Sequence, residues 1–350
     1  MTSAAVGVTA LALLAVAAVV AVEVVSRAAA AVGGEQIWLK DLALQRKDDQ
    51  MRRLGRGRRP EVVFVGSSAT MCAVDPAVLK QQFGIEAYNA AIFRGAMSYL
   101  RQWATDFVLP RCAPTVMVLE VWLVTLNDNS AAVENGEQYR QAPYFTSLAR
   151  WRAVYDLGSW LTCLRVLPLL RQPRRCREVA AGMWGRRTFA SRHRPLTIEN
   201  VVGPHGESIE HDAKLQHRTG PRMHTALEGF VRDFHLGGAQ WSALTQLVEH
   251  AGSRGIKVLL YEPPSTARLQ DEYFPGGRAA WDAAHARLRA MTRTLDATWL
   301  DLDLEMTDEQ YFADAVHANL AGKQLVSRAV GAAIVHQVAP RPGSLDRAVR

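Results

Sequence analysis

The sequence predicts a three-layer α/β/α fold with a parallel sheet at its centre. Short apolar runs rich in β-branched residues alternate with amphipathic stretches over residues 60–128 and again over 225–335. Runs that are apolar enough to be buried on both faces are typical of parallel strands covered by helices. With 350 residues and 49% hydrophobic composition, the chain can bury one large core or two ordinary ones.

The first strand is expected within EVVFVGSS, residues 61–68, where four apolar residues end at Gly66. Asp75 and Pro76 then supply an N-cap and a first-turn proline for a helix over 76–84. The elements that follow are predicted as a strand over 85–92, a helix over 97–109 and a third strand over 114–124.

The same alternation returns near the C-terminus. A helix is expected over 243–255 and closed by Gly255, and the strand 256–264 after it is stopped by two prolines. A helix over 278–295 follows, and a short strand over 298–303 completes the predicted sheet. The main domain is predicted over 60–335, followed by a C-terminal tail over 336–350. Strands that alternate with helices in this way build βαβ units.

Between the third and fourth strands, over about 129–224, the rhythm is lost. This stretch holds an Arg cluster from Arg165 to Arg194 and the turn-rich VVGPHGES. It is interpreted as a large insertion that serves as a lid or a substrate-recognition subdomain.

The N-terminus predicts a transmembrane anchor over residues 1–25. Residues 4–22 form an apolar run of about the length that spans a bilayer. A cleaved signal peptide is the alternative, but the run is longer than a usual signal core and no Lys or Arg precedes it. Positive charge follows the run, in a basic connector over 26–59, and by the positive-inside rule this favours a cytoplasmic main domain.

The formal net charge of +7 suits an anionic membrane surface or polymer. No zinc-finger spacing or RNA-recognition signature accompanies it, so nucleic acid is not an expected partner. The histidines of the insertion are expected on a solvated surface rather than in a metal site. The four cysteines show no metal-ligand spacing; they are either buried free thiols or, in an exported domain, form up to two disulfides, of which Cys163 with Cys176 is the most local.

Candidate catalytic residues follow the ends of the predicted strands, where ligands bind in doubly wound sheets. Ser67 and Ser68 follow the first strand, and DAVHANLAGKQL, which contains Asp314 and His317, follows the last. A serine nucleophile requires a base and a carboxylate that orients the base. Asp314 and His317 are three residues apart, so the carboxylate can hold one ring nitrogen while the other faces a serine. The alternative is a purely structural role, in which the two serines permit a tight turn and Asp314 caps a turn.

Two stretches resemble the SGNH (GDSL-type) hydrolase and acyltransferase superfamily. VVFVGSSATMCAVDP is similar to its first block, with GSS in place of GDS, and DAVHANLAGKQL is similar to its D-x-x-H-x-N-x-x-G block. NAAIFRGAMS and VTLNDN resemble the blocks between them. The resemblance implies a flavodoxin-like sheet and a triad of Ser68, His317 and Asp314, with no cofactor or metal. It further implies an oxyanion hole formed by Ser68, Gly95 and Asn127; the alternative is that Gly95 serves only the backbone and Asn127 is a loop residue.

Relatives with GSS-type blocks and an N-terminal anchor resemble proteins that acylate cell-envelope polymers. The resemblance therefore implies O-acyl transfer to or from an envelope polysaccharide, outside the cytoplasm, with a membrane-bound acyltransferase as a possible partner. This location conflicts with the charge bias near the anchor. The alternatives are a simple esterase or lipase that uses water as the acceptor, and an inactive envelope scaffold.

Overall fold

The computed structural model of the 350-residue chain describes residues 13–14, 16–18, 21, 43–44, 46–93, 95–133, 201–209, 212, 227–302, 304 and 306–338. The chain divides into two compact units, one of Arg46–Glu137 with Asn200–Arg350, and one of Met1–Gln45 with Gln138–Glu199. We call the first the α/β unit. The predicted insertion at 129–224 is thus divided, because its two ends belong to the α/β unit.

The α/β unit contains a five-stranded parallel sheet with the order β2-β1-β3-β4-β5 in the described residues. Its strands are β1 (Val62–Val65), β2 (Ala87–Asn89), β3 (Val116–Glu120), β4 (Lys257–Tyr261) and β5 (Thr298–Trp299). The chain starts at β1, adds β2 on one side, and then crosses to β3 on the other side. This order is that of flavodoxin-like sheets, so the predicted parallel α/β architecture is confirmed.

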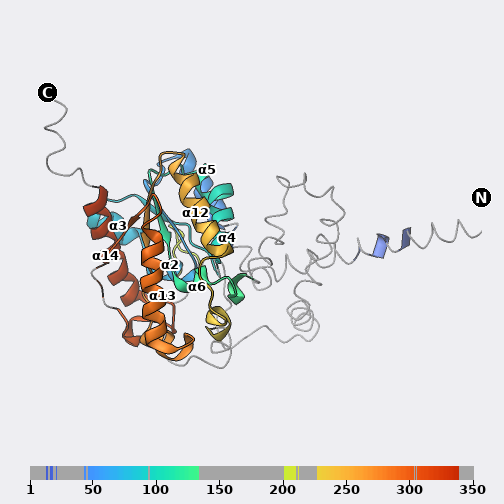
Figure 1. The fold of residues 1–350 in the computed structure, drawn as a ribbon. Coiled ribbons are helices and arrows are strands. Elements are labelled where there is room, and N and C mark those ends of the chain that lie inside the picture. Colours follow the sequence, from blue (N-terminus) through green and yellow to red (C-terminus); the bar gives the residue numbers. More distant parts are fainter. Residues whose placement is uncertain are drawn as a thin grey trace, which may run out of the picture. The chain divides into compact units, whose positions relative to one another are not determined.

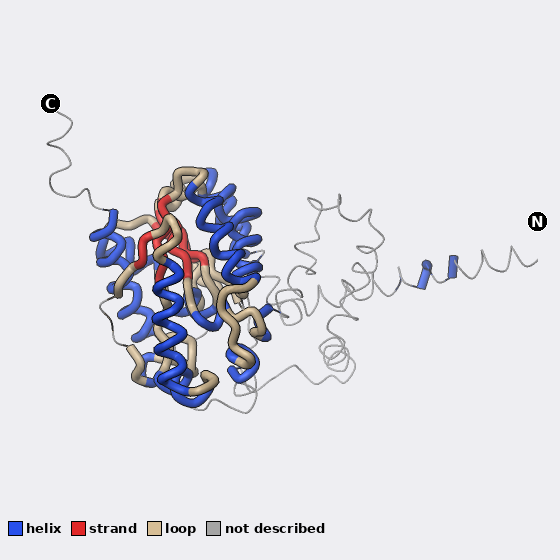
Figure 2. Tube along the Cα trace, in the orientation of Figure 1, coloured by secondary structure: helices blue, strands red, loops and turns tan. Residues whose placement is uncertain are grey.

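Helices cover both faces of the sheet. Figure 1 shows α3 and α14 on one side of the strands and α4, α5 and α12 on the other, and Figure 2 shows the same layers by element type. The described helices are α2 (Ser68–Ala73), α3 (Pro76–Phe83), α4 (Met97–Trp103), α5 (Leu109–Cys112), α6 (Leu123–Leu126), α12 (Ala239–Gly252), α13 (Gly277–Thr292) and α14 (Leu320–Val338). Single-turn π segments lie at Ala104–Val108 and Leu269–Tyr273, and a 3-10 turn at Glu309–Tyr311.

Alternate side chains of the strands form the core under α3 and α14. Val62 and Phe64 of β1 and Val118 of β3 pack in one cluster with Val326 and Val330 of α14. All five are 1% exposed or less. Because α14 follows the loop that holds Asp314 and His317, this packing fixes the position of that loop against the sheet.

Local signals read from the sequence explain how several elements begin and end. Asp75 caps α3 by accepting the Ala77 N–H at 2.8 Å, and α3 ends at Gly84 with φ +70°. The predicted third strand was too long, because the backbone leaves the sheet after Glu120 and turns into α6. The predicted last strand was also too long, since β5 pairs over only two residues.

Two segments outside the predicted βαβ pattern are built into the α/β unit. Residues 46–56 are helical, and Lys47 is 1% exposed where the sequence predicts part of a basic connector. Its Nζ donates to the Asn89 carbonyl at 2.7 Å and also to the carbonyl of Gly206. Burial lowers the pKa of Lys47 to about 7. Residues 201–209, which the sequence assigns to the insertion, therefore pack beside β2.

The predicted anchor lies almost entirely outside the described residues. In the part of the chain that the structure describes, no helix is long and apolar enough to cross a membrane. The Arg165 to Arg194 cluster, Cys163 and Cys176 also lie outside that part. Cys72 and Cys112 are buried thiols, as one of the two interpretations of the cysteines predicts.

Candidate active site

Ser68 is the first residue of α2, directly after β1. Ser67 is the N-cap of this helix, with an extended backbone, and its Oγ accepts the Ala69 N–H at 3.2 Å. Ser67 is buried, whereas Ser68 is half-buried. The two serines therefore have different local roles: Ser67 caps the turn, and Ser68 presents its hydroxyl.

The loop between β5 and α14 places Asp314 and His317 on one tight turn. Asp314 Oδ1 accepts the backbone N–H groups of Val316 at 3.0 Å and His317 at 2.9 Å. The sequence ANLAGKQLVSRAV predicts a helix capped by Asn319, with Leu320, Val326 and Val330 as its apolar stripe. The cap is confirmed, since Asn319 Oδ1 accepts the Gly322 N–H at 3.1 Å. Leu320 was wrongly assigned, because it is 43% exposed at the first position of α14.

The structure brings Ser68, His317 and Asp314 together. His317 Nε2 lies 2.9 Å from Ser68 Oγ, and His317 Nδ1 lies 2.8 Å from Asp314 Oδ2. Both side chains of the His–Asp pair are 14% exposed. Burial alone would raise the pKa of Asp314, but the His317 charge and the hydrogen bonds from the ring and from two backbone N–H groups hold it well below its ordinary value.

Beneath this turn lies Glu120, which the sequence analysis did not single out. It ends β3, is 0% exposed, and its Oε2 accepts the Ser67 N–H at 2.8 Å and the Ser67 hydroxyl at 3.0 Å. The same oxygen accepts the N–H and hydroxyl of Thr70. Burial raises the pKa of Glu120, and the hydrogen bonds from Thr70 and Ser67 act in the opposite direction. The sequence signal that could have pointed to Glu120 is an acidic residue at the end of an otherwise apolar strand.

Two of the predicted oxyanion donors are compatible with that role. The N–H groups of Ser68 and Gly95 make no hydrogen bond to any residue that the structure describes. A side chain at position 95 would meet Leu100, since a Cβ there would lie 2.5 Å from Leu100 Cδ2. Packing against Leu100 therefore also favours glycine at this position.

Asn127 does not fit the predicted oxyanion hole. Its Nδ2 donates to the carbonyls of Phe230 and Arg232, each at 3.1 Å, and its Oδ1 accepts the N–H groups of Asn129 and His235. Both amide hydrogens are thus used to hold the chain before α12. The prediction was wrong because Asn127 follows α6, several residues after β3 ends.

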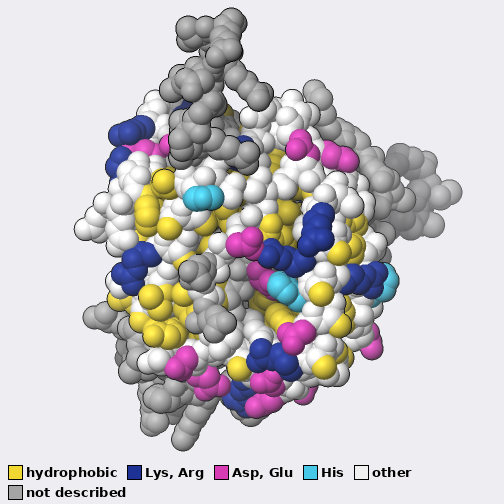
Figure 3. Space-filling view, turned by 60° about the vertical axis from the view of Figure 1, so that its left-hand side comes forward, with side chains coloured by type: hydrophobic (Ala, Val, Ile, Leu, Met, Phe, Trp, Pro, Cys, Tyr) yellow, Lys and Arg dark blue, Asp and Glu magenta, His cyan; other side chains and the backbone are white. Residues whose placement is uncertain are grey.

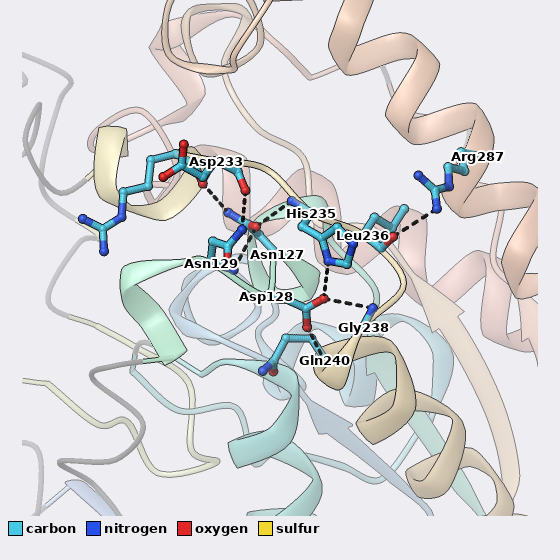
Figure 4. A network of polar contacts seen from close by, with 10 residues as sticks. Asn127, Asp128, Asn129, Asp233, His235, Leu236, Gly238, Gln240 and Arg287 are labelled. Atoms are coloured by element: carbon cyan, nitrogen blue, oxygen red, sulfur yellow. Dashed lines mark hydrogen bonds and ion pairs between the residues drawn. The ribbon is translucent and has the colours of Figure 1, made fainter.

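A second Asp–His pair lies next to Asn127 (Figure 4). His235 Nδ1 lies 2.8 Å from Asp128 Oδ2, and Asp128 also accepts the N–H groups of Gly238 at 2.9 Å and Gln240 at 2.7 Å. The His235 side chain is 62% exposed, and no described hydroxyl is hydrogen-bonded to its Nε2. This pair holds the start of α12.

The described residues contain no group of three or more His, Cys, Asp or Glu side chains that could hold a metal ion. A cavity of about 510 Å³ is lined by side chains such as Glu262, Trp281 and Trp299, and neither Ser68 nor His317 lines it.

No family model matches the sequence, and no curated protein matches it. Several solved structures are similar to this chain, and two of them illustrate the likeness. One is assigned to the G-D-S-L lipolytic family of Desulfitobacterium hafniense, with 13% identity, a TM-score of 0.37, and coverage of 78% of this chain and 98% of its own. The other is assigned as an acylhydrolase of Bacteroides fragilis, with 12% identity, a TM-score of 0.41, and coverage of 83% and 96%. Both TM-scores are low, so the geometry of the site, rather than these similarities, supports a function.

Proposed function

We propose that the protein is a serine-dependent acyl hydrolase or acyltransferase of the SGNH (GDSL-type) superfamily. The observation that carries the proposal is the continuous chain of contacts from Ser68 Oγ through the His317 ring to Asp314. The nucleophile and the base are far apart in the sequence, since 249 positions separate Ser68 and His317. A nucleophile, a base and an orienting carboxylate in this order are the groups that acyl transfer requires.

In the first half of the reaction, Ser68 Oγ attacks the carbonyl carbon of an ester. Its proton passes to His317 Nε2, which lies 2.9 Å away in the resting structure. Asp314 holds the ring with Nδ1 protonated and stabilises the imidazolium that forms. The unbonded N–H groups of Ser68 and Gly95 are the candidate donors to the negative oxygen of the tetrahedral intermediate.

The intermediate then collapses: the bond from the acyl carbon to the alcohol oxygen breaks, the leaving alcohol takes the proton from His317, and an acyl group remains on Ser68. In the second half, an acceptor hydroxyl gives its proton to His317 and attacks the acyl carbon. The bond between Ser68 Oγ and the acyl carbon then breaks, and His317 returns the proton to Ser68 Oγ. The acceptor is water in a hydrolase and a second alcohol in a transferase. The triad serves either acceptor equally, so the acceptor is decided by what binds beside it.

We favour a cell-envelope polysaccharide as the acyl donor or acceptor. Support comes from the apolar run at residues 4–22, which would keep the enzyme at a membrane, and from the excess of Lys and Arg. On the face shown in Figure 3, basic and acidic side chains are interspersed rather than gathered by sign. In this proposal the α/β unit lies outside the cytoplasm, and a membrane-bound acyltransferase supplies the acyl group.

Hydrolysis of p-nitrophenyl acetate by the purified protein tests the proposal. We expect p-nitrophenol release by the wild type and a loss of at least about a thousand-fold in kcat for Ser68→Ala, because the nucleophile is removed. The matched control is Ser253→Ala, an exposed serine just after α12 whose loss leaves activity within about two-fold.

An inactive wild type, or a Ser68→Ala variant as active as the wild type, would contradict the proposal. The first result favours the alternative of an inactive envelope scaffold. A simple esterase is separated from a transferase by adding a polysaccharide acceptor and measuring whether acyl groups appear on the polymer or only as free acid.

A further inference from the structure

A buried carboxylate contacts both sides of the proposed nucleophile. Glu120 Oε2 accepts two hydrogen bonds from Ser67 and two from Thr70, the residues that lie one before and two after Ser68. From this we infer that Glu120 is a positioning residue, which holds the turn so that Ser68 Oγ points at His317. The inference rests on the proposed function and assigns Glu120 a part in the same site.

The hydrogen bonds converge on a single oxygen. Glu120 Oε1 is buried and has no hydrogen-bond partner among the residues that the structure describes, while Oε2 takes all four donors. Hydrogen bonds to a carboxylate are roughly twice as strong as those between neutral groups. The carboxylate therefore joins the end of β3 to the first turn of α2 more firmly than an amide would.

The sheet in turn fixes the carboxylate. Glu120 of β3 is the register partner of Tyr261 in β4, so the two side chains lie on the same face of the sheet. The Tyr261 hydroxyl donates to Thr70 Oγ1, and Tyr261 is fully buried. Gly66 permits this close approach, because a Cβ there would lie 2.7 Å from Glu120 Oε2.

The same contacts leave one donor of the turn unused. Glu120 takes the N–H of Ser67 and of Thr70, and the Ser67 hydroxyl takes the N–H of Ala69. The Ser68 N–H lies between them and makes no hydrogen bond to a described residue. Glu120 thus holds the turn in a form that points the Ser68 hydroxyl at the base and keeps the Ser68 N–H available for an oxyanion.

The test compares Glu120→Gln with Glu207→Gln. Glu207 is a matched control, because it is also a buried acid, 6% exposed, but bonds to the N–H of His205 rather than to the Ser68 turn. For Glu120→Gln we expect the rate of Ser68 labelling by a fluorophosphonate to fall roughly 10- to 100-fold, since small misplacements of a reacting atom have effects of this size. The KM for p-nitrophenyl acetate should stay within about two-fold, and Glu207→Gln should label at the wild-type rate.

A second measurement does not depend on activity. The ring ¹⁵N resonances of His317 report its contact with Ser68 Oγ, and Ser68→Ala gives their positions when that contact is absent. In folded Glu120→Gln protein, we expect these resonances to move toward their positions in Ser68→Ala. Thr70→Val, which removes one hydroxyl donor with little change in shape, should move them in the same direction by less.

The two readouts separate the inference from the function on which it rests. A folded Glu120→Gln protein with wild-type His317 resonances overturns the positioning role, whatever its activity. If the wild type fails to label, the proposed function fails, and the resonances still decide whether Glu120 sets the contact between Ser68 and His317. If Glu120→Gln does not fold, Thr70→Val decides by the same resonances.

Discussion

The α/β unit contains two Asp–His pairs that share one geometry and differ in their surroundings. In both, Nδ1 lies 2.8 Å from the Oδ2 of the aspartate, in Asp314–His317 and in Asp128–His235. His317 is 14% exposed, whereas His235 is 62% exposed. The Nε2 of His317 lies within hydrogen-bond distance of the Ser68 hydroxyl, and that of His235 makes no hydrogen bond to a residue that the structure describes.

The aspartates also differ in what else they hold. Asp314 accepts backbone N–H groups from its own turn, so its carboxylate shapes the loop that carries the base. Asp128 accepts those of Gly238 and Gln240, so its carboxylate caps α12. An Asp–His contact by itself therefore does not identify a catalytic site. The two pairs differ in whether a serine hydroxyl lies within hydrogen-bond distance of the histidine Nε2, and in how deeply the histidine is buried.

The largest expected effect separates the two histidines. His317→Ala should lower kcat for p-nitrophenyl acetate by about 10⁵-fold or more, because Ser68 loses the base that takes its proton. His235→Ala should stay within about two-fold of the wild type, since an exposed histidine outside the triad is replaced. Equal losses in the two variants would show that the geometry does not distinguish the pairs.

The next effect separates the two aspartates by activity and by stability. Asp314→Ala should lower kcat by roughly 10³- to 10⁴-fold, because the ring of His317 loses the group that orients it. Asp128→Ala should keep nearly full activity and lose about 1 kcal/mol of stability as the N-terminus of α12 loses its cap, or about 2–4 °C in Tm. Thermal unfolding and esterase assays of both variants measure this, and a reversed pattern would contradict the assignment.

The smallest effect concerns acid stability. The pKa of Asp314 is lower in the folded state than in the unfolded state, so its ionised form contributes stability above the unfolded value, about 3.8, and this is lost as the pH falls through the folded value. Urea unfolding at pH 5 and pH 3 should therefore show a smaller loss for Asp314→Asn than for the wild type. Identical losses in the two proteins would remove Asp314 as a source of the acid dependence.

Much of the α/β unit could be predicted because its signals are local. Apolar runs marked the strands, and Asp75 with Pro76 marked the start of α3. The pairing of Ser68 with His317 was predictable from chain order, since parallel strands bring their carboxyl ends to one edge of the sheet.

The two errors at the candidate site concern residues whose partners are distant in sequence. Asn127 was predicted to contribute to the oxyanion hole, but its side-chain amide donates hydrogen bonds to carbonyls more than 100 residues away in the sequence. Glu120 was overlooked because its partners, Ser67 and Thr70, lie about 50 residues earlier and no motif links them. A spacing pattern reports the residues of one turn, whereas these contacts depend on how the strands are placed in the sheet.

The most direct test is labelling of the purified wild-type protein by a fluorophosphonate, followed by mass mapping of the modified peptide. The contact of Ser68 with His317 predicts one adduct, on Ser68, that is lost in His317→Ala and kept in His235→Ala. An adduct on another serine, or no adduct on a folded protein, would contradict the assignment of Ser68 as the nucleophile.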